Sequence, residues 1–527
     1  MPTRRDALLM GSALAAFTLA PGANVMRALA QNAVPVRRSL ATMKPDDPDL
    51  SAFREAVGIL KARTSGPVTW QTLYRIHGDG EVFNHCPHGN WYFLPWHRAF
   101  VVTYERVVRD VTGYQQFAMP YWDWAADRNF PAVFAAETYE GQPNPLFDEG
   151  RNLVNIAQPL PDKWVGPQVM DQIANEPTYD LFGSFMLPGQ DSLDLNWVSP
   201  HPWKSSTQGL LENTPHNQIH NWIGGDMPTA QSPRDAIFQM HHGNIDRIWA
   251  EWNHTGHLNP SAYARDPNGQ PIYPAAYWAD MVFTDNFFYP DGTPWSPKVT
   301  DLEDTEALGY RYDFPDVPQA VLMALGPRGD AARTQTLAAL ADRATGGAAD
   351  AAVIPVEGTA RLTAPLAITV PVARATIAAI AEAPRGSSRL LMLAAPPARP
   401  RVLAIIRDIA YTNQESTSFN VFLDRPGVDP DVSPDDAHYV GSVSFFGPSG
   451  HGGHGGHGGH GSDGGGMAGP GVVLDLTDTI ARVYGPRAEI PDGLTLQIQP
   501  VPLGPGDGLG EVGTFTPTSV EIVIVPA

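Results

Sequence analysis

Two clusters of histidines, far apart in the chain, carry the residue types best suited to chemistry. The first comprises His77, His85, His88 and His97, and the second comprises His216, His220, His241 and His242. Each cluster can supply three imidazoles to one metal ion, and neutral imidazole binds copper, zinc, iron and nickel. Because neither set needs a carboxylate or a thiolate, the pattern favours a pair of copper ions over a hydrolytic zinc site.

Helices are the elements that must position the second cluster. His216 and His220 are four residues apart, so on a helix they share one face. Asn213 and Thr214 are residue types that begin helices, and Pro215 suits a first helical position. The sequence therefore predicts a helix that begins at this point and points both rings at one ion.

Two further helices are expected to carry the remaining ligands. Pro95 begins a predicted helix over Trp96–Val108 that holds His97 in its first turn. His241 and His242 are adjacent, so on a helix their side chains point about 100° apart. We therefore expect only one of these two rings to face a common metal.

The residues around these histidines resemble those of a known family. The matching stretches are His88-Gly, Phe93-Leu-Pro-Trp-His97-Arg98, Pro120-Tyr-Trp-Asp-Trp124, Glu212–His220, and Arg234-Asp with His241–Arg247. Together they resemble the type 3 copper family of tyrosinases, polyphenol oxidases and molluscan haemocyanins. The resemblance implies two copper ions, held by His77, His88 and His97 and by His216, His220 and His242. His85 is an alternative to His77, which is preferred because Ile76-His77-Gly78 resembles the family's first ligand.

The resemblance also implies roles for residues beside the ligands. His241 is expected to orient the site without binding metal, and Asp246 to hold a ligand imidazole in one tautomer. The alternative for Asp246 is a helix-surface ion pair with Arg247. Cys86 is the single cysteine, so no disulfide can form within the chain. In relatives a thioether joins such a cysteine to the ligand two residues later, here His88; the alternative is a buried thiol.

The expected reaction is oxidation of phenols by O2, the co-substrate. Glu212, with Asn217, would position a water that takes the proton of a monophenol, whose pKa is about 10. The alternative for Glu212 is an acidic residue at a helix N-terminus. The leading interpretation is a tyrosinase or polyphenol oxidase that converts phenolic small molecules to o-quinones. A catechol oxidase or o-aminophenol oxidase without tyrosine hydroxylation, and a haemocyanin-like O2 carrier, are the alternatives.

The N-terminus predicts export. Thr3-Arg4-Arg5 precedes an apolar run over 7–20 and then Ala28-Leu-Ala30, which is the order of a secretory signal, here over residues 1–30. The paired arginines indicate the twin-arginine route, to the periplasm or outside the cell. No other apolar run can cross a bilayer. The net charge of −21 argues against nucleic acid as a partner. The sequence does not indicate an oligomeric state.

The length of 527 residues predicts two or three domains. Amphipathic runs over Asp46–Arg63, Trp96–Val111 and Ser232–Trp252 predict helices. Residues 31–315 read as a mainly α catalytic domain, a four-helix bundle holding the dicopper site. Residues 316–355 read as a linker. Residues 356–527 show period-two runs typical of an all-β antiparallel sandwich or barrel. The runs that predict strands are 367–372, 418–423, 439–445, 472–476, 494–498 and 519–525. This region resembles the domain that covers the copper site of plant relatives and keeps them latent; a stability or assembly domain is the alternative. Within it, the His/Gly-rich loop over 448–471 predicts a flexible segment that could bind copper or nickel.

Overall fold

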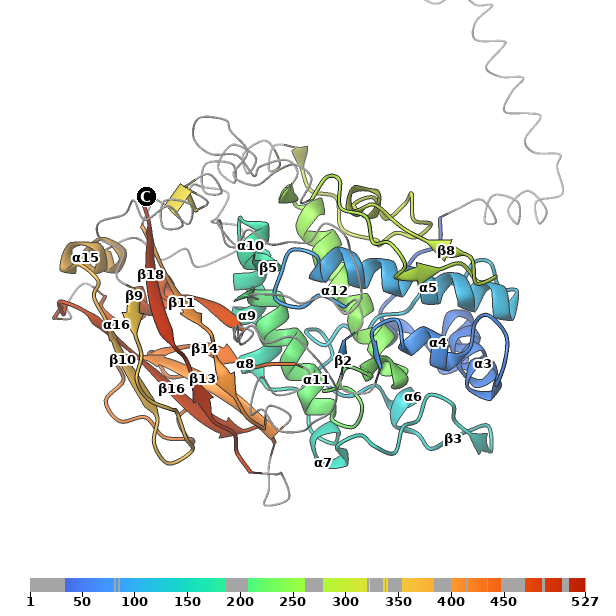
Figure 1. The fold of residues 1–527 in the computed structure, drawn as a ribbon, viewed down its shortest axis with the longest axis horizontal. Coiled ribbons are helices and arrows are strands. Elements are labelled where there is room, and N and C mark those ends of the chain that lie inside the picture. The colour runs from blue at the N-terminus through green and yellow to red at the C-terminus, as the bar shows by residue number, and fades with distance from the viewer. Residues whose placement is uncertain are drawn as a thin grey trace, which may run out of the picture.

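The structure is a computed structural model in which a helical part and a β-rich part lie side by side (Figure 1). It describes residues 34–79, 82–83, 86–185, 207–260, 278–319, 353–382, 400–413, 416–433, 435–446, 470–485, 489–504 and 511–526, with a few single residues between 322 and 339. The expected signal over 1–30, most of the linker, His85 and nearly all of the His/Gly-rich loop lie outside the described residues. Within the described part, no helix is both long and apolar enough to span a membrane.

Four helices frame the first half of the chain. They are α3 (Pro48–Ala62), α5 (Phe93–Thr112), α11 (Asn217–Ile223) and α12 (Ile237–His254). The central pair is α5 and α12, and α3 packs on α5. The sequence predicted α3, α5 and α12 because their apolar residues recur at helical spacing. Gly113 ends α5 in a left-handed conformation with φ 71°, which glycine adopts without steric cost.

The second cluster is carried by a helix whose start differs from the prediction. Residues Glu212–His216 form a turn of π-helix, η2, that continues directly into α11, and Pro215 lies inside it. Asn213 does not cap the helix, because its side-chain oxygen accepts a hydrogen bond from the Ser444 amide of the second half. A tertiary contact therefore replaces the local capping that the sequence predicted. Such π turns concentrate at functional sites.

The second half is built on two sheets. One has the order β10 (Leu366–Val370), β16 (Leu494–Pro502), β13 (Thr417–Leu423) and β14 (Tyr439–Val443), all antiparallel. The other has the order β5 (Ser184–Phe185), β6 (Thr207–Gln208), β15 (Gly471–Asp475), β11 (Arg401–Arg407), β18 (Ser519–Val525) and β9 (Val353–Pro355). Every period-two run predicted as a strand overlaps one of these strands.

The expectation of an all-β, purely antiparallel second domain is wrong in two respects. Two helices, α15 (Arg374–Glu382) and α16 (Thr477–Val483), pack against each other within it. The six-stranded sheet also takes in β5 and β6 from the first half, and β6 pairs with β15 in parallel. The two halves therefore share a sheet, which a chain divided at a linker does not anticipate.

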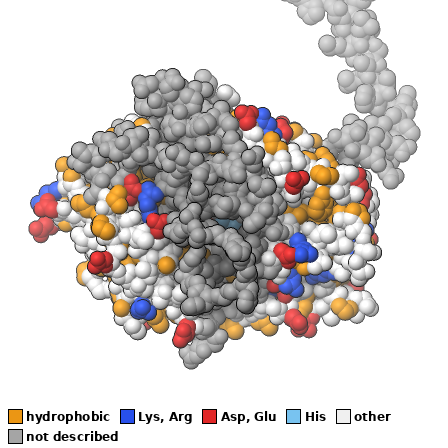
Figure 2. Space-filling model, viewed as in Figure 1, with side chains coloured by type: hydrophobic (Ala, Val, Ile, Leu, Met, Phe, Trp, Pro, Cys, Tyr) orange, Lys and Arg blue, Asp and Glu red, His pale blue; other side chains and the backbone are white. Residues whose placement is uncertain are grey.

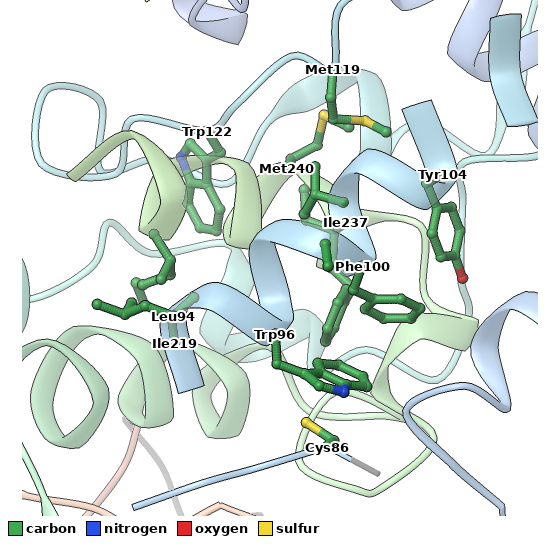
Figure 3. Packing of buried hydrophobic residues seen from close by; sticks show 14 of the residues in the cluster. Cys86, Leu94, Trp96, Phe100, Tyr104, Met119, Trp122, Ile219, Ile237 and Met240 are labelled. Atoms are coloured by element: carbon green, nitrogen blue, oxygen red, sulfur yellow. The ribbon is translucent and has the colours of Figure 1, made fainter. Parts of the chain in front are cut away.

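Each half has its own apolar core, but the two are not isolated, because Leu503 of the second half packs into the helical core and a smaller cluster also joins the halves. Trp96 of α5 lies beside Cys86, and Phe100, one turn further along α5, lies beside Ile237 of α12 (Figure 3). The smaller cluster takes Leu181 from the first half. Its other buried members come from the six-stranded sheet: Leu403, Ile405, Val473, Val523 and Val525. On the face shown in Figure 2, acidic and basic side chains are interspersed, and the described residues there form no broad basic patch.

Candidate metal centre

The fold gathers the predicted histidines into two groups. One holds His77, Cys86, His88 and His97, and the other holds His216, His220, His241 and His242. In each group the candidate ligand atoms all lie within 4.8 Å of one another. The groups touch, because the rings of His97 and His242 stack with centroids 4.3 Å apart. One compact, dinuclear centre therefore fits this arrangement.

Backbone carbonyls orient three of the rings. Nδ1 donates to a carbonyl in His77 (Ala230, 2.6 Å), His97 (Phe93, 2.7 Å) and His220 (Met227, 2.7 Å). A carbonyl can only accept, so Nδ1 carries the hydrogen in each ring and Nε2 keeps its lone pair. This is the arrangement by which proteins orient metal-binding imidazoles.

The remaining nitrogens test whether the site suits a metal. The Nε2 atoms of His220 and His242 lie 3.2 Å apart, and the buried Nε2 of His216 has no hydrogen-bond partner among the described residues. Burial lowers the pKa of His216 to about 3 and that of His77 to about 4, so both rings are neutral. Neutral, buried imidazoles with unused lone pairs fit copper and also fit other imidazole-binding metals.

His241, which was expected to orient the site without binding metal, lies among the candidate ligands of the second group. Its ring reaches the second group together with His242, although the two residues are neighbours on α12. Both of its ring nitrogens are buried, and neither has a hydrogen-bond partner within the described part of the chain. Its ring stacks on that of His216, with centroids 5.4 Å apart. Side-chain torsions bring the rings together even though the two Cβ atoms diverge around the helix.

The Cys86 thiol lies between two rings of the first group. Its sulfur is 3.7 Å from Nδ1 and 3.9 Å from Nε2 of His88, and 3.3 Å from Nε2 of His97. Burial raises the pKa of the thiol well above its ordinary value, so it is neutral here. The expected partner, His88, is thus within reach, although the sulfur is nearer to His97.

Glu212 ties the two groups together. Both of its carboxylate oxygens accept from the Gly89 amide, at 2.8 and 2.9 Å, and one also accepts from the Ser184 hydroxyl. Burial raises the pKa of Glu212 to about 8, although these hydrogen bonds oppose the rise. The carboxyl group is therefore mostly protonated at neutral pH.

Asn217 does not join Glu212 as the sequence predicted. Its Oδ1 lies 2.8 Å from Nδ1 of His216, and its Nδ2 donates to Gln208 and to the Ser444 carbonyl. The described contact between Asn217 and Glu212 is a helical hydrogen bond, in which the Asn217 amide donates to the Glu212 carbonyl, and no described contact joins their side chains. Asn217 therefore orients the His216 ring and binds the second half of the chain.

Asp246 also differs from the expectation. Its carboxylate accepts from Arg37, Arg98, Tyr310 and Tyr312, and no described hydrogen bond links it to an imidazole. Burial opposes its ionisation, but the two guanidinium groups hold its pKa below the ordinary value. Asp246 therefore pairs with buried arginines. The alternative, an ion pair with Arg247, is not formed either, because Arg247 bonds Asn244 and Glu251.

One residue at the centre was missed by sequence reasoning. Phe446 follows β14, and its ring centroid lies 4.4 Å from that of His220 and 4.8 Å from that of His88. It is also 5.6 Å from His216 and 6.0 Å from His77. The ring thus inserts between the two groups from the second half of the chain. Nothing in the local sequence separates Phe446 from its neighbour Phe445, which packs in the β-rich core.

Comparisons with known proteins agree with this centre. Residues 67–255 match the family model described as the common central domain of tyrosinase. Polyphenol oxidase II of Ipomoea batatas is 27% identical over 250 residues, which are 44% of this chain and 40% of that protein. Tyrosinase HcTyr1 of Hahella is 27% identical over 52% of this chain and 62% of its own length. The tyrosinase of Streptomyces antibioticus is 30% identical over 34% of this chain and 68% of its own.

The fold has relatives among solved structures. Latent aurone synthase, a polyphenol oxidase, matches with a TM-score of 0.57 and 15% identity over 94% of this chain and 90% of its own. Latent apple tyrosinase matches with a TM-score of 0.57 and 18% identity over 93% and 97% of the two chains. These likenesses cover both halves of the chain, whereas the curated sequence matches to Ipomoea and Hahella reach less than two thirds of those proteins.

Proposed function

Because this chain belongs to the type 3 copper family of tyrosinases and polyphenol oxidases, we propose that it uses O2 to hydroxylate monophenols and to oxidise o-diphenols to o-quinones. The observation that carries the proposal is the pair of touching histidine groups around the Phe446 ring. An aromatic ring already occupies the space between the groups, so a phenol of similar size fits there once Phe446 leaves.

The proposed ligands are the six histidines that the resemblance assigns. His77, His88 and His97 would hold one copper, and His216, His220 and His242 the other. The bound pair supplies the electrons that reduce O2. The carbonyls that accept from the Nδ1 atoms fix the rings of His77, His97 and His220 and leave their Nε2 lone pairs available to hold the metal. His241 lies close enough to replace a ligand of the second group.

Glu212 is the proton acceptor in this proposal, in a form revised from the sequence. Its pKa of about 8 means that it must be ionised before it can take a proton from a phenol. Asn217 supports the reaction by orienting His216, to which it is hydrogen-bonded. A thioether between Cys86 and His88 remains part of the proposal, and it would fix the His88 ring.

The chain is proposed to be latent, with residues 356–527 as the cover. Phe446 fills the space that a substrate ring needs, and Asn217 and Asn221 hold the residues just before it. Cutting the linker over 316–355, or mild acid or detergent, would release the ring. The proposal also includes the frame of the site and the location of the protein. Helices α3, α5, α11 and α12 form the four-helix bundle. The signal over 1–30 directs export to the periplasm or outside the cell.

Oxygen uptake tests the proposal. The copper-loaded full chain, cut within the linker, should consume O2 with tyrosine and with a catechol. His242→Ala should abolish both activities. His254→Ala is the matched control, because His254 is an exposed histidine at the end of the same helix, and it should retain them. Reaction with the catechol alone would favour a catechol oxidase. Reversible O2 binding without turnover would favour an O2 carrier and contradict the proposal.

A further inference from the structure

A row of polar side chains lines one face of the helix that carries His216 and His220. Its members recur every three to four residues: Asn213, Thr214, Asn217, Gln218 and Asn221. That spacing places them on adjoining stripes of the helix surface. Each of the four residues with an amide side chain exposes 2% or less of its surface. We call these five side chains the amide ladder.

The amide ladder binds the main chain of residues 442–445. Thr214 donates to the Ser442 carbonyl (2.9 Å), Asn217 to that of Ser444 (2.9 Å) and Asn221 to that of Phe445 (2.8 Å). Asn213 accepts from the Ser444 amide at 3.1 Å, and Gln218 lies 3.5 Å from the Val443 carbonyl. Most of these contacts go to groups that every residue possesses. Recognition of this kind tolerates many sequences.

The bound segment ends at the metal centre. Phe446 follows these four residues, and its ring is the one inserted between the two histidine groups. The ladder therefore positions a peptide so that the aromatic side chain at its C-terminal end enters the centre. A single amino acid has no preceding residues and cannot engage the ladder in this way.

Removing the segment would leave the ladder without its partners. Buried amides that lose their hydrogen bonds are destabilising unless water or another polar group replaces them. Two acceptors, Oε1 of Gln218 and Oδ1 of Asn221, already lack a partner among the described residues. They offer sites for the N–H groups of an incoming main chain.

We propose that the opened enzyme acts on tyrosyl residues within extended polypeptides, with the amide ladder binding the residues that precede the tyrosine. The inference rests on the proposed function, because it concerns the substrate of the same centre. The reaction is balanced: one tyrosyl side chain and one O2 give one o-quinone and one water. One oxygen atom enters the ring and the other leaves as water, and the phenol supplies all the electrons that O2 takes up.

Peptide binding tests the ladder independently of catalysis. The full chain, with a protease site inserted between Gly346 and Gly347, would be cut and used without metal. The probe is labelled Gly-Ser-Val-Ser-Phe-Tyr amide, which copies residues 441–446 with tyrosine last, and the comparison is the same composition in reverse order. Fluorescence anisotropy should show binding about tenfold tighter for the tyrosine-last peptide. Only this order lets the ladder bond the preceding residues while the aromatic ring enters the centre, and about two hydrogen bonds account for a difference of this size. Equal affinities would overturn the inference.

Two variants examine the contacts themselves. Thr214→Val keeps the shape of the side chain and removes its hydroxyl, and Asn221→Leu removes a donor to the Phe445 carbonyl. Each should reduce the preference for the tyrosine-last peptide several-fold. Asn129→Leu changes an asparagine outside the ladder, at a loop position, and should keep the preference. A preference unchanged in both ladder variants would contradict the assignment.

Oxidation separates this inference from the proposed function. With copper bound, the cut chain should oxidise the tyrosine-last peptide with a kcat/KM at least about tenfold above that for N-acetyltyrosine amide. Oxidation of a catechol without this preference would refute the peptide substrate alone. If no phenol were oxidised, the proposed function would be refuted. The anisotropy measurement would then still test peptide binding to the ladder, because it does not depend on catalysis.

A substitution in the intact chain gives a further readout. Phe446→Tyr places a phenol on the ring that already lies in the centre. With copper, O2 and ascorbate, the substituted side chain should gain the mass of one oxygen atom, detected by mass spectrometry of the digested protein. If the new phenol stayed unmodified in a chain that oxidises added catechol, the segment would not be held as a substrate is.

Discussion

Asp246 on α12 and Arg98 on α5 form a buried ion pair between the two helices that carry His242 and His97. Arg98 follows His97 in sequence, and Asp246 lies one helical turn after His242. Arg37 binds the other carboxylate oxygen at 2.9 Å, and Tyr310 donates to that oxygen at 2.8 Å. This cluster therefore fixes the spacing of the two helices that carry the touching rings of His97 and His242.

Asp246→Asn should destabilise the chain and weaken metal binding. Removing the charge leaves two buried guanidinium groups without their shared partner, which typically costs about 3–5 kcal/mol. Thermal unfolding and the copper content after dialysis would measure both effects. Asp313→Asn, which breaks the exposed pair with Arg311, should change the unfolding free energy by less than about 1 kcal/mol. Full copper content in Asp246→Asn would show that the pair does not position the centre.

Phe446→Ala should activate the uncut chain. The ring is held by apolar and aromatic contacts among the histidines, worth about 1.5–3 kcal/mol for a buried side chain of this size. Losing them should raise catechol oxidation by about tenfold or more in the full chain. Phe445→Leu, at the neighbouring residue in the β-rich core, keeps apolar bulk and should leave the enzyme latent. Unchanged latency in Phe446→Ala would remove this ring from the account of inhibition.

Hydroxylation of tyrosine should depend on the ionisation of Glu212. Burial raises the pKa of Glu212 to about 8, so the ionised fraction grows as the pH rises through that value. The rate with tyrosine should rise over the same range. Glu212→Gln should lose about a hundredfold or more of that rate and flatten the profile, with a smaller loss on catechol. Glu149→Gln, at an exposed position, serves as the control. Equal losses on both substrates would assign Glu212 to structure.

Acid should loosen the cover by protonating Asp475, which supports an arginine that reaches across to the first half. Arg401 of the second half binds Glu176 of the first at 2.7 Å and Asp475 at 2.8 Å. Burial opposes the ionisation of Asp475, but Arg401 holds its pKa below the ordinary value. The depressed pKa of Asp475 means that its ion pair with Arg401, within the second half, stabilises the folded protein at neutral pH. This effect is lost as the pH falls below about 4, which loosens the arginine that reaches Glu176.

Removing the charge of Glu176 should loosen the contact between the two halves at neutral pH. Glu176→Gln should raise the activity of the uncut chain at pH 7 several-fold, because the interdomain partner of Arg401 is lost. Asp436→Asn breaks a pair with Arg425 inside the second half and should not activate. Activity of the uncut chain, assayed after brief exposure to a series of pH values, measures the transition. Activation of both variants alike would point to general loosening of the β-rich half.

The sequence predicted what local spacing controls. The four-residue interval between His216 and His220, the apolar periodicity of α3, α5 and α12, and the alternating strands of the second half all depend on neighbours along the chain. The predicted start of the helix that carries His216 was wrong, because the side chain of Asn213 accepts a hydrogen bond from the Ser444 amide and does not cap the helix. Capping preferences describe only neighbouring residues, so they cannot predict a hydrogen bond to a residue that is distant in the sequence.

The missed features depend on long-range contacts. Strand β11 was not predicted because its residues 402–406 are buried on both faces and show no alternation. Phe446 has the same local context as Phe445, yet one ring enters the metal centre and the other the β-rich core. Asp246 carries the charge expected of an orienting group, but its arginine partners lie in α5 and in the N-terminal segment.

The shared six-stranded sheet has a consequence for the order in which the chain folds. Strand β6 is bonded on one side to β5 and on the other to β15, which the ribosome makes much later. Until β15 emerges, the nascent first half exposes an unpaired strand edge, the kind of surface through which chains associate wrongly. The Gly89 carbonyl, next to His88, accepts from the amide of Thr207 in the same strand. Synthesis through β15 is therefore needed before the strand that supports the loop carrying His88 is paired on both sides.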